Sequence, residues 1–243
     1  MTRLLAAFAF LTRIPIPRHF DDEDVGRSTV FFPLVGAAIG SVLLLLWTLA
    51  PFPPLLTAAL AVTLSAWLTR AMHLDGLADF ADGLAGGRTR EDVLEIMKDP
   101  RVGAFGAVAV ALLLAVKVAA IESLPDARAL IVAPALARWA SVPVSMGLPY
   151  ARRDGIGLAL SVHVGSVELI GATLSCVCLS LVAPPRFVLY SAGAVVLASF
   201  FVLAIAWRRL GGITGDVLGA NTELAETAAL VAAVGWTSSP SPC

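Results

Sequence analysis

The chain has 243 residues, of which 58% are hydrophobic and 14% charged, and its net charge is −1. A soluble globular domain carries about 25% charged residues, so this composition predicts a polytopic membrane protein. The near-neutral charge gives no reason to expect nucleic-acid binding, and the three cysteines indicate neither a disulfide scaffold nor a metal site.

We therefore expect an all-α fold, a polytopic integral membrane helical bundle with about seven transmembrane helices and an N-terminal interfacial helix. The apolar stretch at the start is short and leads into Thr12-Arg13-Ile14-Pro15, so residues 1–13 are predicted as an interfacial helix within an interfacial segment over 1–30. Residues 237–243 are predicted as a flexible tail. The whole chain, 1–243, is expected to be a single membrane-embedded domain.

Seven apolar runs, several of them near the roughly 20 residues that cross the hydrocarbon, are the candidate spans. They lie at about residues 34–50, 55–70, 103–121, 129–147, 167–183, 187–207 and 224–236. Basic residues then set the orientation, since cytoplasmic loops carry the excess of Lys and Arg. With the N-terminus inside, the inner face collects Arg3, Arg13, Arg18, Arg27, Arg70, Arg88, Arg90, Lys98, Arg101, Arg152, Arg153, Arg208 and Arg209. The outer face receives only Arg128 and Arg186.

The first polar motif is His73-Leu-Asp75-Gly-Leu-Ala-Asp79-Phe-Ala-Asp82-Gly83, directly after an apolar run. On a helix its aspartates fall within roughly 60° of arc, so they share one face. Such a face repels itself unless a cation is bound, and Mg²⁺ takes carboxylate oxygens while keeping positions open for substrate phosphates. A solvated acidic loop is the alternative reading of this spacing.

A second acidic set lies in the segment from Gly211 to Glu226. Asp216, Glu223 and Glu226 share a helical face if a helix begins near Thr214. The glycines of this segment, Gly215 among them, would let the backbone approach a phosphate at the helix N-terminus. The alternative is a glycine-rich turn with ordinary capping by Thr214 or Asp216.

Several basic residues could complement the two acidic faces. Lys98, Arg101, Arg152 and Arg153 are candidates for phosphate oxygens, although each could also be a headgroup anchor. Arg138 lies near the middle of a predicted span, where a charge indicates a lined cavity or pathway.

Two further polar residues are interpreted individually. Lys117 lies closer to the end of its predicted span, where snorkelling to the headgroups fits. His73 is either a general base or metal ligand, or an ordinary hydrogen-bonded residue.

With these residues in view, the sequence resembles the cobalamin synthase family, the adenosylcobinamide-GDP ribazoletransferases. The similarity covers nearly the whole chain through FLTRIPIP from Phe10, FPLVG from Phe32, HLDGLADFADG, MKDPRVGAFG from Met97, YARRDGIG from Tyr150 and GGITGDVLGANTELAE. The acidic motif and its TGDVLGA partner are specific in combination.

The resemblance implies a Mg²⁺-dependent, multi-pass enzyme in the plasma (inner) membrane of a prokaryote, with its active site facing the cytoplasm. Its expected partners are adenosylcobinamide-GDP, α-ribazole or its 5′-phosphate, and the lipid bilayer. A ribose hydroxyl would attack the cobinamide-linked phosphorus and GMP would leave. Whether the protein forms a homo-oligomer stays open.

Carried onto matching positions, the resemblance implies metal coordination by Asp75, Asp79, Asp82 and Asp216, with Glu223 and Glu226 nearby. The catalytic candidates are Asp82, as acceptor of the attacking hydroxyl's proton, Asp75 and His73. The substrate-binding candidates are Lys98, Arg101, Arg138, Arg152, Thr214 and Gly215.

Two other function classes compete with this reading. Asp79-Phe-Ala-Asp82-Gly83 is also similar to a motif of the CDP-alcohol phosphotransferases, but that family's later arginine and two further aspartates are not evident. A cation transporter would explain Arg138 and carboxylates near spans. Transporters place coupling sites near the bilayer midplane, whereas these acids are expected at cytoplasmic span ends.

Overall fold

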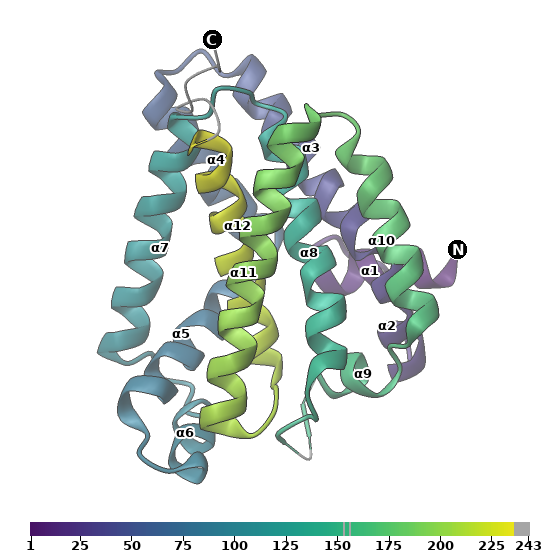
Figure 1. Cartoon of the computed structure of the whole chain (residues 1–243), viewed down its shortest axis with the longest axis vertical. Coiled ribbons are helices and arrows are strands. Elements are labelled where there is room, and N and C mark those ends of the chain that lie inside the picture. The colour runs from purple at the N-terminus through teal and green to yellow at the C-terminus, as the bar shows by residue number, and fades with distance from the viewer. Residues whose placement is uncertain (153, 156, 236–243) are drawn as a thin grey trace.

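The computed structural model describes residues 1–152, 154–155 and 157–235 (Figure 1). The tail predicted at 237–243 and the phosphate candidate Arg153 lie outside these residues. The described chain forms helices joined by loops, which confirms the all-α prediction. They are α1 (Thr2–Leu11), α2 (Asp22–Arg27), the 3₁₀ helix η1 (Ser28–Phe31), α3 (Phe32–Leu49), α4 (Pro54–Leu68), α5 (Met72–Gly86), α6 (Arg90–Ile96), α7 (Ala104–Glu122), α8 (Ala129–Gly147), α9 (Gly157–Val162), α10 (Ser166–Ser180), α11 (Pro185–Leu210) and α12 (Gly215–Gly235).

Five helical stretches of the described chain are long and apolar enough to cross a membrane: Asp22–Leu49, which includes α3, and the helices α7, α8, α11 and α12. The bent pair α4 and α5 makes a sixth if it counts as one span. The predicted number of seven is not confirmed. Helices α4 and α10 have 15 residues each, which is about 22 Å of helix against a hydrocarbon core of roughly 30 Å.

Helix α12 begins earlier than the last predicted span. It starts at Gly215 rather than near residue 224, so Asp216, Glu223 and Glu226 all lie on one membrane-spanning helix. The second acidic set therefore extends from the end of the bundle into its interior.

The chain turns sharply between α4 and α5, whose axes differ by 90°. Arg70 and Ala71 adopt left-handed φ angles of 57° and 54° at this break, which side-chain-bearing residues rarely do. The guanidinium of Arg70 donates to the carbonyls of Ala9 and Phe10, each at 3.1 Å, and so ties the break to α1. The turn directs α5 against α12, so that the two acidic segments meet.

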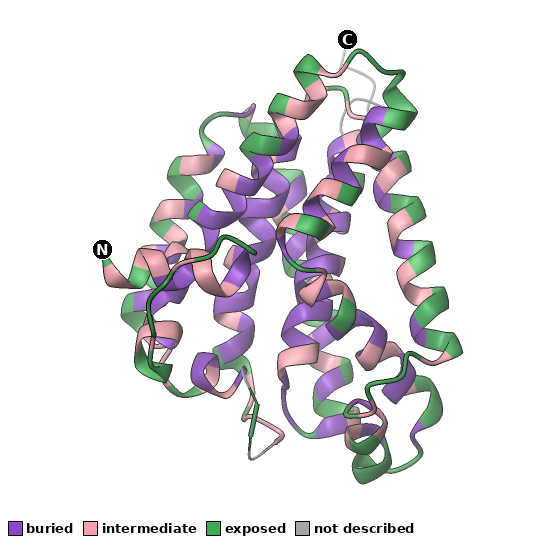
Figure 2. Ribbon diagram, turned by 180° about the vertical axis from the view of Figure 1, so that it is seen from behind, coloured by how far each residue is buried: buried purple, intermediate pink, exposed green. Residues whose placement is uncertain are grey.

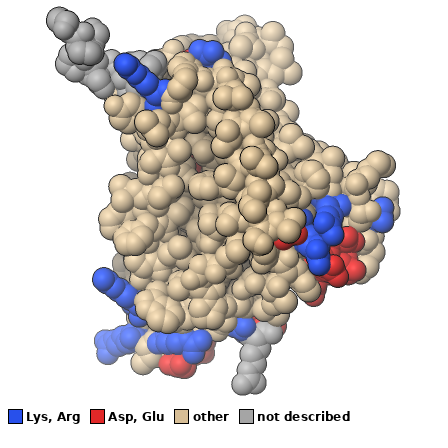
Figure 3. Space-filling view, turned by 45° about the vertical axis from the view of Figure 1, so that its right-hand side comes forward, with Lys and Arg blue, Asp and Glu red and all other residues tan. Residues whose placement is uncertain are grey.

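Helices α8 and α12 form the interior of the bundle, whereas α7 and α11 form its outside (Figure 2). In the apolar windows of α8 and α12, 78% and 72% of the residues are buried, against 28% and 22% in α7 and α11. Outward side chains such as Leu112 and Phe200 are apolar. Figure 3 shows the same pattern, with charged side chains gathered at the ends and along one edge of a largely uncharged face. This surface fits a lipid environment.

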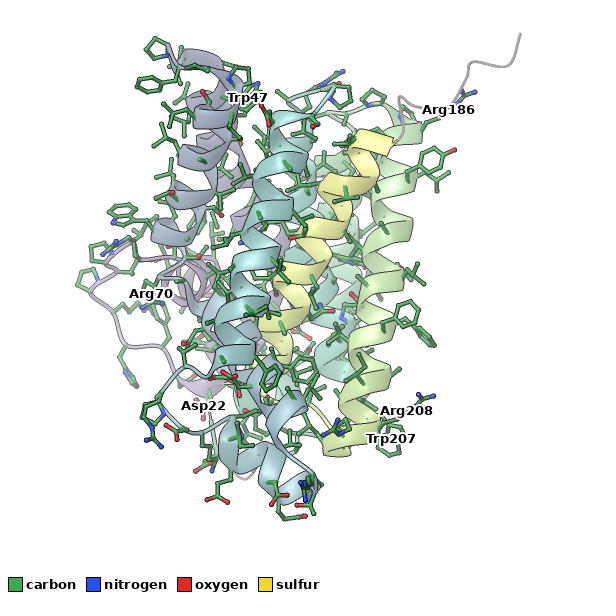
Figure 4. The ribbon with its side chains drawn as sticks, turned by 90° about the vertical axis from the view of Figure 1, so that its left-hand side faces the viewer. Asp22, Trp47, Arg70, Arg186, Trp207 and Arg208 are labelled. Carbon is green, nitrogen blue, oxygen red and sulfur yellow. The ribbon has the colours of Figure 1, made fainter. Side chains whose placement is uncertain are left out.

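The two ends of the bundle differ in their labelled residues (Figure 4). Trp47 and Arg186 lie toward one end, and Trp207 and Arg208 toward the other. Arg70, which the sequence assigned to the same face as Arg208, lies at a level between the two ends. The reason is that α4 is too short to carry the chain across before it turns. Which end faces the cytoplasm stays a prediction.

Candidate active site

A cavity of about 350 Å³ opens where the first half of α5, the N-terminus of α12 and the loop after α8 meet. It brings together five of the residues predicted from the sequence: His73, Asp75, Arg152, Gly215 and Asp216. Its complete lining is Phe10, Leu11, Phe32, Met72, His73, Asp75, Gly76, Ser141, Tyr150, Arg152, Gly155, Gly157, Leu160, Gly215, Asp216, Leu218, Gly219 and Thr222.

Close packing of α5 on α12 places the two acidic segments side by side. A Cβ atom added to Gly76 would lie 2.9 Å from the backbone oxygen of Asp216, and one added to Gly219 would lie 3.3 Å from the Cα of His73. At Gly76 only glycine permits this approach, because a Cβ would meet the backbone of α12, and at Gly219 a Cβ would be a tight contact. As a result Asp75 and Asp216 line the same cavity, at points 141 residues apart in the sequence.

Arg152 joins the loop after α8 to the acidic pair. Its Nη1 lies 2.9 Å from Oδ2 of Asp216, and its Nη2 donates to the carbonyl of Met97 at 3.2 Å. Two backbone hydrogen bonds hold the loop in place, from Ala151 N to the Ile213 carbonyl at 2.7 Å and from Ile213 N to the Pro149 carbonyl at 2.9 Å. The guanidinium of Arg152 is thus held at the cavity next to the carboxylate of Asp216.

The aspartates of α5 lie on one helix, as predicted, but meet different partners. Asp79 is half-buried and is not among the cavity-lining residues, but it has Asp216, Asp75 and Asp82 as like-charged neighbours and Arg152 as a cationic one. Asp82 instead accepts hydrogen bonds from the backbone N–H groups of Gly103, at 2.7 Å, and Gly106, at 2.8 Å.

Asp82 therefore binds the N-terminus of α7, where a carboxylate satisfies free N–H groups. A Cβ added to Gly106 would lie 2.3 Å from the carboxylate of Asp82, so glycine is needed at position 106 for this contact. Asp82 is not among the residues that line the cavity. Its predicted roles as proton acceptor and metal ligand stay predictions.

Beneath the cavity, four charged side chains form a buried cluster. Lys117 Nζ lies 2.5 Å from Glu223 Oε2 and 3.1 Å from Glu226 Oε1. Arg138 is also paired with Glu226. These side chains are at most 8% exposed. Burial of such charges is tolerable only because each has an opposite partner.

This cluster bears on several predictions. The snorkelling predicted for Lys117 is wrong, because its ammonium finds carboxylates inside the bundle instead of headgroups outside it. Glu223 and Glu226 already have cationic partners, and Arg138 already has an anionic one. Metal coordination by the glutamates and diphosphate binding by Arg138 stay predictions.

Two of the basic candidates lie at the surface outside the cavity lining. Lys98 Nζ lies 3.5 Å from Asp154, in the loop that carries Arg152. Arg101 donates from Nε and Nη2 to the carboxylate of Asp99, at 2.9 and 2.6 Å. These hydrogen bonds lower the pKa of Asp99 to about 2. Arg101 is thus neutralised locally, and phosphate binding by either residue stays a prediction.

The start of α12 combines capping with close packing. Thr214 is fully buried, and its hydroxyl accepts from Val217 N at 3.3 Å, as the capping alternative predicted. Gly215 packs against Gly157: a Cβ added to Gly157 would lie 2.8 Å from the Cα of Gly215. The same added Cβ would lie 3.1 Å from the phenol oxygen of Tyr150, so the start of α12 lies close to this phenol. Substrate binding by Thr214 and Gly215 stays a prediction.

Tyr150 is a cavity residue that sequence reasoning did not select. Its phenol lines the cavity, and burial raises its pKa above the ordinary value. The signals available were its place two residues before Arg152 and the YARRDGIG motif that it begins. Tyr150 and Gly215 line one cavity although they are 65 residues apart, which sequence spacing does not reveal.

Part of the cavity lining is polar. Ser141 of α8 and Thr222 of α12 share a hydrogen bond of 2.8 Å between their hydroxyl oxygens. His73, only 5% exposed, has an Nδ1 atom that is buried with no hydrogen-bond partner among the described residues. Two hydroxyl-bearing side chains and an imidazole thus form a polar part of the cavity lining.

The donor set fits a hard divalent cation only in part. Within the described residues, no group of three or more His, Cys, Asp or Glu side chains is arranged to hold a metal ion. Asp75 and Asp216 nevertheless line one cavity. Mg²⁺ is usually bound by one or two carboxylates together with substrate phosphates, not by a complete protein cage. The residues present therefore fit Mg²⁺ that arrives with a phosphorylated substrate.

The fold and the site define a polytopic helical membrane protein with an acidic cavity, in which Arg152 is paired with Asp216. The chain matches the family described as Cobalamin-5-phosphate synthase over residues 3–234, and it belongs to that family. The resemblance found in the sequence is thereby confirmed.

Several relatives carry the name adenosylcobinamide-GDP ribazoletransferase. That of Sinorhizobium medicae is 44% identical over 91% of this chain and 92% of its own length. The relative from Syntrophobacter fumaroxidans is 43% identical over 93% and 96%. The one from Chlorobaculum tepidum is 41% identical over 97% and 96%. No solved structure matches the chain.

Proposed function

We propose that this protein is a transferase that joins adenosylcobinamide-GDP to α-ribazole or its 5′-phosphate and releases GMP, at a late step of cobalamin assembly. Relatives with that name match nearly the full length of the chain. The observation that carries the proposal is the placement of Asp75, Asp216 and Arg152 in one cavity. Carboxylates and a fixed guanidinium are the groups that phosphoryl transfer needs.

In the proposed reaction, a ribose hydroxyl oxygen of the acceptor forms a bond to the cobinamide-linked phosphorus. The bond from that phosphorus to the GMP oxygen breaks, and the hydroxyl proton passes to a carboxylate. Arg152 is placed to bind diphosphate oxygens, and Asp75 is an exposed carboxylate at the cavity. Positioning of the two substrates supplies much of the rate acceleration.

Mg²⁺, when bound, would neutralise the diphosphate and the leaving GMP. We propose that Asp75 and Asp216 hold it, with Asp79 next to them. The repulsion among these neighbouring carboxylates supports this assignment, because a cation between them relieves it. We also propose that the protein lies in the inner membrane with this cavity toward the cytoplasm, as the predicted distribution of basic residues favours.

The test is a GMP-release assay on the protein in nanodiscs, with adenosylcobinamide-GDP, α-ribazole and Mg²⁺. Wild type should release GMP and form a cobalamin, whereas EDTA should stop both. Asp75→Asn and Asp216→Asn should lower kcat by at least about 100-fold. Asp126→Asn is the matched control, because Asp126 pairs only with Arg128 and the nearby backbone at a loop outside the cavity.

Two results would contradict the proposal. One is wild-type protein that makes no GMP or cobalamin from these substrates. The other is release of CMP from a CDP-alcohol, which would identify a lipid-headgroup enzyme instead.

A further inference from the structure

The cavity is too small to enclose both proposed substrates. Its volume of about 350 Å³ lies near the lower limit of the roughly 300–1,000 Å³ typical of small-molecule sites. α-Ribazole is a substituted benzimidazole on one pentose, whereas adenosylcobinamide-GDP carries a corrin macrocycle and two nucleosides. Only the smaller molecule fits inside, so the larger one has to approach from the mouth.

One wall of the cavity is aromatic. Phe10 of α1 and Phe32 at the start of α3 stack with ring centroids 5.9 Å apart and planes 12° apart. Phe32 is only 2% exposed, and Leu160 of α9 lines the same cavity at 4% exposure. A flat, apolar bicyclic base is the kind of group that packs well on such a surface.

The same lining also offers hydrogen-bonding groups. The Ser141 and Thr222 hydroxyls pair at 2.8 Å, and buried Nδ1 of His73 has no partner among the described residues. An unpaired buried nitrogen is costly, so a ligand that supplies a hydroxyl or ring nitrogen gains that interaction on binding. Asp75, Asp216 and Arg152 line the same cavity.

We propose that this cavity is the subsite for the acceptor nucleoside. Its benzimidazole lies against Phe10, Phe32 and Leu160, its polar edge meets Ser141, Thr222 and His73, and its sugar points toward Asp75 and Arg152. The corrinoid then docks outside the cavity with only its diphosphate reaching in. This inference rests on the proposed function and adds which substrate the enclosed space selects.

The decisive variant is Leu160→Phe, which fills the cavity from α9. Val162→Phe is its matched control, because Val162 lies two residues away on the same helix but is 63% exposed. We expect Leu160→Phe to raise KM for α-ribazole at least about tenfold, while KM for adenosylcobinamide-GDP changes less than about twofold. Val162→Phe should leave both KM values as in wild type.

Direct binding provides a second readout that does not need turnover. Equilibrium dialysis of α-ribazole against the protein in nanodiscs, without corrinoid, should show saturable binding by wild type and Val162→Phe. Leu160→Phe should lose it. If Leu160→Phe does not fold, Phe10→Leu replaces it, because this change on half-buried Phe10 removes one aromatic face and should also weaken α-ribazole binding.

The outcomes separate this inference from the proposed function. Absence of GMP release by wild type would overturn the function. Normal GMP release together with an unchanged KM for α-ribazole in Leu160→Phe, or a rise in KM for the corrinoid alone, would overturn the subsite assignment only.

Discussion

Gly76 on α5 touches α12 at Asp216: a Cβ added to Gly76 would lie 2.9 Å from the backbone oxygen and 3.0 Å from the Cα of Asp216. The missing side chain allows two acidic segments from distant parts of the chain to share one cavity. The geometry of the site therefore depends on a residue that carries no functional group.

We predict that Gly76→Ala lowers activity by separating α5 from α12. Overpacking of this kind costs about 1–3 kcal/mol, and the displaced carboxylates should reduce kcat by at least about tenfold. Gly193→Ala is the control, since nothing lies within 4 Å of a Cβ added at that position. GMP release measures the effect, and equal activity of the two variants would contradict the prediction.

We predict that Arg152→Lys lowers activity although lysine keeps the positive charge. The guanidinium contacts Asp216 and the Met97 carbonyl with different nitrogens, which a single ammonium cannot reproduce. We expect kcat/KM to fall about 10- to 100-fold. Arg208→Lys serves for comparison, because Arg208 is exposed near the end of α11, which Arg90 links to the loop of Arg152 through the Leu210 and Ala151 carbonyls. A variant as active as wild type would show that Arg152 does not contact the substrate.

Removal of Lys117 is predicted to destabilise the fold. Lys117→Met leaves Glu223 without its cation inside the bundle, and loss of one partner from a buried pair costs about 3–5 kcal/mol. The double variant Lys117→Met/Glu223→Gln should recover part of this loss. Thermal unfolding in detergent measures it, with Arg186→Met, at an exposed position, as the reference. Equal melting temperatures for all variants would refute the prediction.

Tyr150→Phe is predicted to lower activity without changing its pH dependence. Burial raises the pKa of the Tyr150 phenol above its ordinary value, so the neutral form is present at all pH values below about 10. Loss of the phenol oxygen from the cavity lining should reduce kcat/KM about three- to tenfold. The profile of kcat/KM from about pH 7 to 9 should keep its shape. A shifted alkaline limb would mean that Tyr150 ionises during turnover.

The sequence predicted the helical class well because apolar runs are local features. It also placed Asp75, Asp79 and Asp82 on one helix, since their spacing matches the helical period. Its count of seven spans is not confirmed, because hydropathy reveals neither the 90° turn after α4 nor the short 15-residue lengths of α4 and α10. Arg70 and Ala71 adopt left-handed conformations at that turn, which the residue types Arg and Ala do not predict.

The candidate site was predicted only in part, since the partners of its charged residues are distant in sequence. Lys117 was placed at the headgroups because its glutamates lie more than 100 residues away on α12. Asp82 was grouped with Asp75, but its carboxylate accepts hydrogen bonds from the N–H groups of Gly103 and Gly106.

By itself the sequence determined that this chain is a helical membrane protein with acidic helices, and its motifs indicated the family. Composition and periodicity are properties of neighbouring residues, so a linear reading suffices for them. Only the tertiary structure decided which carboxylates line the cavity and which are neutralised by Lys117, Arg138 or backbone N–H groups. A charge's partner is set by which helices pack together, and at Gly76 and Gly219 that packing depends on distances of a few ångströms.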